Sequence, residues 1–380
     1  VSVYYKHELR KEKTVGDYRR QIVEGLYDGM FNSRLEELTR KSDPPFLYAY
    51  SGGGRFVRSK EIYVLSAGVK DNGIERGLET LLTEAARVKK FGFTSTELER
   101  QKKELLRSME QAYNERDKTE SRNFTREYVS NFLDEEPIPG IEYEYKLYQQ
   151  YLPGITLEEV NRLASERISE ENRVVMVNAP EKKDVKVPTQ EELSAIFKSV
   201  EKSDITAYDD KVTTEPLISN PPVPGTIKEE NLIKDLGVTE WKLSNGVRVI
   251  LKPTDFKNDE IMLTAFSPGG TSLVDDKNYV AASSASVIVA EGGVGKFDQT
   301  ALQKMLQGKI VNVFPYISEL DEGFSGGCSP KDFETMLQLI YSYATSPRMD
   351  STAYLSYMEK IKAMLKNRNA RPETAFEDTL

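Results

Sequence analysis

The chain has 380 residues, of which 38% are hydrophobic and 30% are charged, a mixture typical of a globular protein with two or three domains. With 52 Lys and Arg against 61 Asp and Glu, the formal net charge is −9, so we expect no nucleic acid as a partner. No apolar run approaches the roughly 20 residues of a membrane-spanning helix, so we expect no membrane span either.

Residues 1–182 predict a first unit of strands and helices. "VSVYYKHE" alternates as a strand does, and residues 14–40 carry apolar side chains at helical spacing. "PPFLYAYSGGGRFVRSKEIYVLSAGVK" is expected to form two strands around a turn at its glycines, since "SGGG" lacks the Lys-Ser/Thr ending of a phosphate loop.

Helices dominate the rest of this unit. A helix is expected over residues 74–90, and Thr94 with Glu97 forms a capping box that opens a long charged helix. Thr156 and Glu159 form a second box, and "RVVMVNAP" is expected to be a short buried strand. Long helices between hairpin-paired strands favour an α+β fold with antiparallel-rich sheets over a doubly wound parallel sheet.

Residues 183–237 differ in character. A short helix is expected from Thr189, and "TTEPLISNPPVPGTIKEEN" is dense in proline and polar residues. We therefore predict an extended surface connector with one short helix.

Residues 238–380 predict a further α+β unit. Asn245-Gly246 marks a hairpin, and "EIMLTAFSPGG" gives a third strand. "YVAASSASVIVAEGG", residues 279–293, is predicted to be a buried helix, and Asp298 caps another helix that stops at Gly308. Two strands follow, and Ser329-Pro330 starts a helix. Because this unit is expected to be incomplete, we predict that the chain is a piece of a longer protein.

Histidine and cysteine each occur once, as His7 and Cys328. A catalytic zinc usually takes three protein ligands, most often with at least two nitrogens or sulfurs, and Ser-His or Cys-His catalysis would also need His7. His7 ends a charged strand, where we expect a solvated side chain. We therefore predict no catalytic, cofactor-binding or metal-binding residue in this chain, and a single cysteine excludes an intrachain disulfide.

Residues 238–350 resemble the pitrilysin/insulinase family of zinc peptidases. In that family, a hairpin like "LSNGVRVILKP" and a strand like "LTAFSPGG" precede a helix with H-x-x-E-H, which binds zinc and activates water. Gly293 and Phe297 match the flank after this helix. Ungapped alignment from them puts the ligand positions on Ser284 and Ile288 and the catalytic glutamate on Val287, so the fold is kept and the site is absent.

The resemblance has implications for the rest of the chain. Long two-half bacterial members have four similar domains, with zinc in the first and no motif in the third. Residues 1–182 would then resemble the second domain, residues 183–237 the connector between the halves, and residues 238–380 the front of the inactive third domain. Zinc is expected in the missing first domain. The expected partners are other domains of the same chain and, through the parent protein, a peptide substrate.

Two further implications stay open. Arg40 and Tyr48 fall near an arginine and a tyrosine that contact substrate in the family's fourth domain; here we expect a structural echo, with substrate contact as the alternative. A periplasmic or otherwise exported location follows by analogy, and a cytoplasmic one is the alternative.

Three functions are consistent with these observations. The first is a non-catalytic fragment of a zinc metallopeptidase that hydrolyses peptides in a closed chamber, contributing chamber wall and connector. The second is an inactive partner subunit of a heteromeric zinc processing peptidase. The third is a helical adaptor built on residues 94–133 with no peptidase link. We favour the first, in which this part of the protein is not itself an enzyme.

Overall fold

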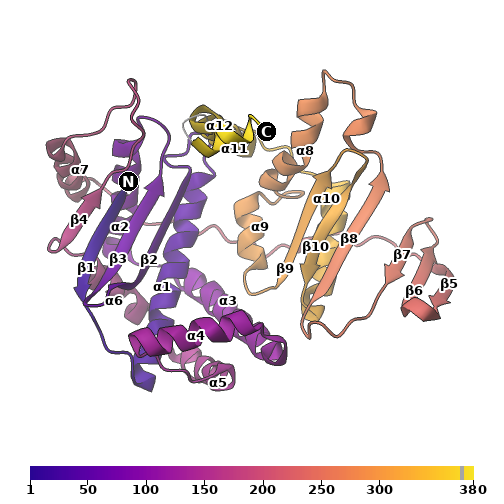
Figure 1. Ribbon diagram of the computed structural model, residues 1–380, viewed down its shortest axis with the longest axis horizontal. Helices are drawn as coiled ribbons and strands as arrows, with labels where there is room; N and C mark the ends of the chain where they lie inside the picture. Colours follow the sequence, from indigo (N-terminus) through magenta and orange to yellow (C-terminus); the bar gives the residue numbers. More distant parts are fainter. Residues whose placement is uncertain (369–371) are drawn as a thin grey trace.

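The computed structural model describes residues 1–368 and 372–380 and contains two α+β units joined by an extended segment (Figure 1). All strand pairs in the three described sheets are antiparallel. The predicted α+β class with antiparallel sheets and long helices is therefore confirmed. Among the described residues, no helix combines the length and the apolar character needed to cross a membrane.

The first unit is built on a sheet with the strand order β2-β3-β1-β4. Its strands are β1 (Ser2–Glu8), β2 (Tyr48–Val57), β3 (Lys60–Gly68) and β4 (Arg173–Met176). Its helices are α1 (Val15–Thr39), α2 (Ile74–Phe91), α3 (Ser95–Asn114), α4 (Ser121–Asp134), α5 (Ile141–Tyr151) and α6 (Leu157–Arg167), with 3-10 turns at Arg116–Lys118 and Leu152–Gly154. Both predicted capping boxes are confirmed, at the starts of α3 and α6.

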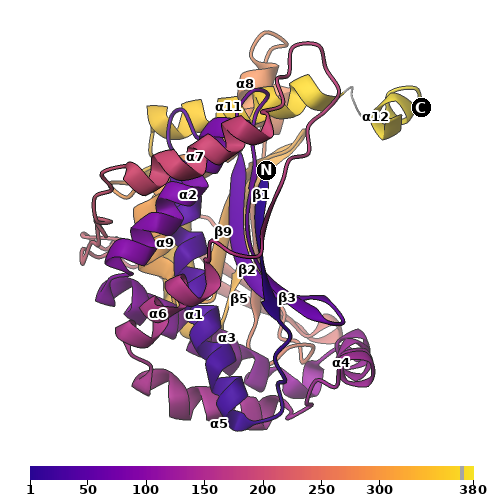
Figure 2. The same cartoon turned by 90° about the vertical axis from the view of Figure 1, so that its left-hand side faces the viewer.

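Only one face of this sheet is covered by helices. Val3 and Tyr5 of β1 pair with Leu65 and Tyr63 of β3, and all four side chains are buried beneath the helices. Figure 2 shows these helices on one side of the sheet and little on the other. Because side chains alternate along a strand, the other residues of these strands lie on the uncovered face. Tyr4, Tyr50 and Phe56 are examples.

Two expectations about this sheet were wrong. The glycines of "SGGG" do not form a turn: they lie inside β2, paired with β3, and the chain reverses at residues 58–59 instead. Gly53 lies beside the guanidinium of Arg167, where a Cβ would be 3.5 Å from Nη2, an ordinary van der Waals contact. Strand β4 is not buried, because it lies at the edge of the sheet, where Val174 and Met176 are about half exposed.

The connector begins on the first unit. Helix α7 (Gln190–Lys202) starts at the predicted Thr189 cap and packs against α2. Phe197, Val200 and Ile205 are buried in the core of the first unit. The chain then crosses to the second unit, where Leu217 packs against a separate apolar core.

The second unit has two small sheets, with the orders β5-β6-β7 and β8-β10-β9. Its strands are β5 (Ile227–Ile233), β6 (Val238–Leu243), β7 (Arg248–Leu251), β8 (Ile261–Pro268), β9 (Val311–Ile317) and β10 (Asp321–Cys328). Its helices are α8 (Tyr279–Gly292), α9 (Gln299–Leu306), α10 (Phe333–Thr345), α11 (Ser351–Arg368) and α12 (Pro372–Glu377), with 3-10 turns at Lys234–Leu236, Gly270–Leu273 and Pro330–Asp332.

The core of this unit lies between α10 and the sheet β8-β10-β9. Met336 and Leu339 of α10 are buried with Val313 of β9 and Cys328 of β10. Cys328 is a free thiol, and burial raises its pKa, with Asp332 adding to the effect. The β6–β7 hairpin turns at Asn245 and Gly246, as predicted.

A half-buried carboxyl group, that of Asp28, lies at the junction of α1 and α6 in the first unit. Arg167 Nη1 is 2.5 Å from Asp28 Oδ1, and the guanidinium also lies over the rings of Tyr27 and Tyr63. Burial raises the pKa of Asp28 to about 6, even though Arg167 favours the ionised form. The folded protein therefore holds a proton on Asp28 at a pH where the unfolded chain does not.

Asp28→Asn should change the pH dependence of stability. The contribution of Asp28 to the free energy of unfolding is fully present below pH 3.8, its pKa in the unfolded chain. This contribution is lost as pH rises through about 6, its pKa in the folded protein. Each pKa unit corresponds to about 1.4 kcal/mol, so the stability of wild type relative to the variant should fall by roughly 2 kcal/mol between pH 4 and 7. Urea unfolding across this range measures the difference, and Asp204→Asn, at an exposed site, is the control. A difference that does not vary with pH would contradict this assignment.

Candidate functional site

Helix α8 lies where the resemblance to the zinc peptidases predicts the H-x-x-E-H helix. Ser284, Val287 and Ile288 all lie within it. The Ser284 hydroxyl donates to the carbonyl of Val280 at 2.6 Å, so it is used by the helix itself. Gly293 ends the helix with a φ of 84°, where a side chain would collide with the carbonyl of Phe297. Gly293 is therefore required at this position by the backbone.

These positions do not fit a zinc ion. Valine and isoleucine have no donor atoms, and zinc is held by cysteine, histidine and carboxylate groups. The nearest acid, Glu291, pairs with Arg40 at 3.5 Å. Among residues 1–368 and 372–380, no group of three or more His, Cys, Asp or Glu side chains is arranged to hold a metal.

The prediction that α8 is buried was wrong. Only Gly292 of this helix is buried, and Tyr279 and Val280 are 52% and 74% exposed. The helix packs against β9 and α11, so its remaining surface has no cover within the described residues. The prediction of burial rested on apolar composition alone. The helix is exposed because it lies at the margin of its unit.

His7, Arg40 and Tyr48 have different surroundings, and of the three Arg40 pairs with Glu291 of α8. His7 is half-buried, and its Nε2 lies 3.1 Å from the Arg167 carbonyl, so the expected solvated side chain was wrong. Strand alternation points His7 to the helix-covered face, as it does Tyr5. Arg40 pairs with Glu36 at 2.7 Å as well as with Glu291, whereas Tyr48 is 62% exposed at the sheet edge.

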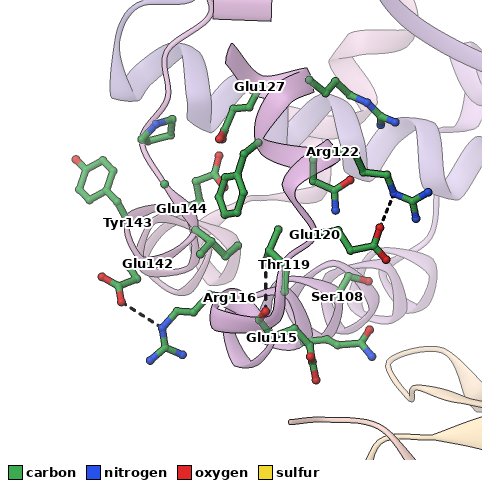
Figure 3. Close-up of a pocket in the computed structure, with 18 of the residues that line it drawn as sticks. Ser108, Glu115, Arg116, Thr119, Glu120, Arg122, Glu127, Glu142, Tyr143 and Glu144 are labelled. Carbon is green, nitrogen blue, oxygen red and sulfur yellow. Dashed lines mark hydrogen bonds and ion pairs between the residues drawn. The ribbon is translucent and has the colours of Figure 1, made fainter. Parts of the chain in front are cut away.

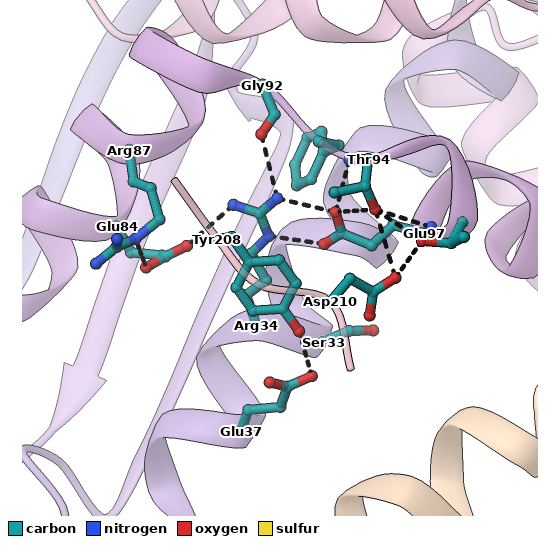
Figure 4. Close-up of polar contacts among 12 residues, drawn as sticks. Ser33, Arg34, Glu37, Glu84, Arg87, Gly92, Thr94, Glu97, Tyr208 and Asp210 are labelled. Carbon is teal, nitrogen blue, oxygen red and sulfur yellow. Dashed lines mark hydrogen bonds and ion pairs between the residues drawn. The ribbon is translucent and has the colours of Figure 1, made fainter. Parts of the chain in front are cut away.

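A network of hydrogen bonds and ion pairs surrounds Arg34 of α1 (Figure 4). Its Nε and Nη2 donate to Glu97 at 2.7 and 2.9 Å, and Nη1 donates to Glu84 at 3.2 Å. The guanidinium carbon lies 4.9 Å from the ring centre of Phe93 and 4.1 Å from that of Tyr208. Burial opposes the charge, but the two carboxylates outweigh it and raise the pKa of Arg34.

Tyr208 and Asp210 extend this site from the connector to the second unit. The Asp210 carboxylate accepts two bonds from Arg100 at 2.9 Å each and lies 3.1 Å from Lys304 Nζ. Lys304, on α9, also donates to the Tyr208 hydroxyl at 2.9 Å and pairs with Glu37 at 2.8 Å. We call residues Arg34, Tyr208, Asp210 and Lys304 the connector clamp, because they join both units to the chain between them.

Electrostatics reinforce the connector clamp. Burial disfavours the charge on Asp210, but hydrogen bonds from Arg100, Thr96 and Lys304 outweigh it and lower its pKa to about 2. Burial and the neighbouring Glu37 carboxylate raise the pKa of Tyr208, so its hydroxyl keeps its proton. Asp210 therefore stays ionised, and Tyr208 stays protonated, across the ordinary pH range.

A second polar joint lies at the other end of the interface. Asp259 accepts from Arg107 at 3.3 Å and from Asn114 at 3.0 Å, both on α3, and from Ser329. Burial opposes its ionisation, but these donors together lower the pKa of Asp259. Ser356 of α11 adds a buried bond of 2.8 Å to the carbonyl of Thr39, so the two units meet at several separate points.

A pocket of about 1130 Å³ lies among α3, α4 and α5 (Figure 3). Charged side chains line it, but several are already paired, including Arg116 with Glu142 at 3.2 Å and Arg122 with Glu120 at 2.7 Å.

Comparison with known proteins gives a consistent result, although no protein-family model matches the chain. The Arabidopsis thaliana protein named zinc protease PQQL-like is 29% identical over 378 residues, which cover 99% of this chain and 34% of that protein. The Escherichia coli protein named probable zinc protease PqqL is 21% identical over 385 residues, which cover 99% of this chain and 40% of that protein.

The resemblance to the pitrilysin/insulinase family of zinc peptidases is confirmed. The solved structure of the ferredoxin protease FusC in complex with Arabidopsis ferredoxin shares the fold, with a TM-score of 0.59 and 17% identity over 99% of this chain and 42% of that chain. The solved structure of E. coli PqqL, described as a periplasmic protease, matches with a TM-score of 0.49 and 19% identity. The match covers 100% of this chain and 42% of that chain. The chain thus spans about a third of the Arabidopsis relative and about two fifths of the E. coli relative.

The connector clamp has no local signature in the sequence. Thr94 and Glu97 were identified as a cap, but Glu97 also binds Arg34, which lies 63 positions earlier in the chain. Asp210 and Tyr208 lie in a polar stretch with no periodic pattern. The available signal was the aromatic side chain of Tyr208, because such a residue usually needs a surface to pack on.

Asp210→Asn should weaken the joint between the units. The lowered pKa of Asp210 implies a stabilisation of roughly 2 kcal/mol above pH 4, which is lost as pH falls through about 2. Circular dichroism during urea unfolding at pH 7 should show a loss of about this size. Asp209→Asn, at the exposed neighbouring position, should cost less than about 0.5 kcal/mol. Equal losses at the two positions would refute the role given to Asp210.

Proposed function

We propose that this chain is a non-catalytic part of a zinc metallopeptidase that hydrolyses peptides in a closed chamber. In this proposal it contributes chamber wall and the connector between two halves. The observation that carries the proposal is α8: it keeps the flanks of the family's motif helix, yet Ser284, Val287 and Ile288 offer no zinc ligands.

The proposed division of the chain follows the family's domain order. Residues 1–182 act as the second domain, residues 183–237 as the connector, and residues 238–380 as the front of a third domain without a zinc motif. Relatives that are two to three times longer support this, because this chain covers 34% of one and 40% of another. Zinc and the glutamate that activates water then belong to a part of the longer protein outside residues 1–380.

The connector clamp suits this role. A chamber wall that joins two halves must fix their relative position. Ion pairs such as Asp210 with Lys304 can do this while the apolar cores of the two units stay separate. Polypeptide substrates and an exported location complete the proposal. Support for them comes from a relative named as a ferredoxin protease and another described as a periplasmic protease.

The absence of zinc ligands at Ser284, Val287 and Ile288 also fits a second function, that of an inactive subunit that pairs with a separate zinc-bearing chain. A chloroplast stromal processing peptidase from Arabidopsis is 21% identical over 348 residues, so processing peptidases are among the sequence relatives. The two functions differ in whether the zinc motif is encoded in the same gene as Val1.

Zinc content and cleavage test the proposal directly. Purified residues 1–380 should hold far less than one zinc per chain by elemental analysis and should cleave no fluorogenic peptide. The natural gene product, purified in the same way, should hold about one zinc and lose its cleavage activity to a chelator. Stoichiometric zinc on residues 1–380 would contradict the proposal. A natural product that has no zinc, and gains cleavage only with a second chain, would favour the inactive-subunit function.

A further inference from the structure

A cleft of about 440 Å³ lies between the two units, beside the connector clamp. Helices α1 and α3 of the first unit form one wall, and α9 with the start of β9 forms the other. Small-molecule sites usually have volumes of about 300–1,000 Å³, so the cleft is large enough for a ligand. Such a ligand would contact both units at once.

The side chain of Gln101 on α3 is buried at this cleft without a partner. Gln101 is only 8% exposed, and within residues 1–368 and 372–380 its amide forms no hydrogen bond. A Cβ on Gly29 of α1 would lie 2.3 Å from Gln101 Nε2, so the amide has room only because residue 29 is a glycine. Buried polar groups are normally hydrogen-bonded, and an unpartnered one is destabilising. The fold therefore holds an amide at the cleft that the protein itself does not use.

Each cation that lines the cleft is already paired. The pairs, at 2.7 to 3.9 Å, are Arg34 with Glu97, Arg100 with Asp210, Lys304 with Glu37, and Lys309 with Asp332. Lys309 Nζ, in the longest of these pairs, also donates to the Thr335 hydroxyl at 2.9 Å. The cleft therefore has no free positive charge to attract an anion.

The carboxylates that line the cleft differ from one another in this respect. Glu36 pairs with Arg40, Glu37 with Lys304, and Glu97 with Arg34. Glu104 accepts the Gly308 amide at 2.7 Å but forms no ion pair with any residue of the described ranges. Its half-buried carboxylate thus lacks a cation.

Gln101 and Glu104 are three positions apart on α3, so they share one face of the helix and are neighbours there. An amide oxygen and an unpaired carboxylate, side by side, are acceptors suited to a donor group that carries positive charge. Leu306 and Val311 line the opposite wall and offer apolar contact for an alkyl chain. The cleft thus combines the polar and apolar contacts that an amphipathic cation needs.

We propose that this cleft binds a small organic cation, with an ammonium or guanidinium group on an alkyl stem. The cation pairs with Glu104 and donates to Gln101 Oε1, while the stem packs on Leu306 and Val311. A metal ion fits less well, because no three His, Cys, Asp or Glu side chains are grouped to hold one in the part of the chain described. Since the walls belong to different units, the bound cation adds a further link to the joint made by the connector clamp.

Calorimetric titration of the purified chain tests the proposal. The probes are n-hexylammonium and n-hexylguanidinium, with hexanoate and 1-hexanol as anionic and neutral probes of matched length. At least one of the two cations should saturate a single site and bind at least about fivefold tighter than hexanoate or 1-hexanol. The same cation should raise the midpoint of thermal unfolding, because it binds the folded protein.

Variants locate the site. Glu104→Gln keeps an acceptor for the Gly308 amide but removes the charge, so binding should weaken at least about tenfold. Gln101→Met is close in shape but has no amide, so binding should weaken about threefold or more. The stability of Gln101→Met in urea should not fall, because the amide it removes has no partner in the protein. The matched control is Glu99→Gln, at an exposed position of α3, which should change binding less than about twofold.

Three outcomes would overturn the proposal. The first is no saturable binding, or equal binding of all four probes, either of which would mean that the cleft holds only water. The second is binding that Glu104→Gln weakens no more than Glu99→Gln does. The third is a loss of stability in Gln101→Met, because the amide would then have a structural role instead of a binding one.

Discussion

A guanidinium buried beneath the surface organises the first unit. The Arg34 side chain is only 2% exposed, and an ionised group in that position is costly unless carboxylates surround it. Glu84 of α2 and Glu97 of α3 supply them, and the Gly92 carbonyl between these helices accepts a further bond at 3.1 Å. The junction of α1, α2 and α3 is therefore fixed by charge as well as by apolar packing.

The same group fixes the path of the connector. Tyr208 stacks on Arg34, and two residues later Asp210 joins Arg100 of α3 to Lys304 of α9. The position of the second unit thus depends on the Arg34 site through short, specific contacts. The two apolar cores remain separate, so what holds the units together is chiefly hydrogen bonds and ion pairs. Such a joint is rigid while its charges are matched and is sensitive to single substitutions.

Uncovered apolar surface follows from the same architecture. Each main sheet has helices on one face, which leaves Tyr50 of β2 and Met262 of β8 exposed on the other. The apolar faces of α8 and α4 are likewise not covered within the described residues. A wall of a larger chamber would have such surfaces, and this agrees with the function proposed above.

Local sequence determined the elements whose signals are short-range. Capping boxes set the starts of α3 and α6, the Asn245-Gly246 pair set a hairpin, and the flanks of α8 gave the family. Donor chemistry alone excluded zinc at Ser284, Val287 and Ile288. Tertiary structure decided what depends on distant neighbours. It placed the glycines of β2 within a strand, left α8 exposed, and brought Arg34, Asp210 and Lys304 together. Periodicity reports which side chains share a face, but burial and ion pairing depend on which element covers that face, and no local pattern contains that information.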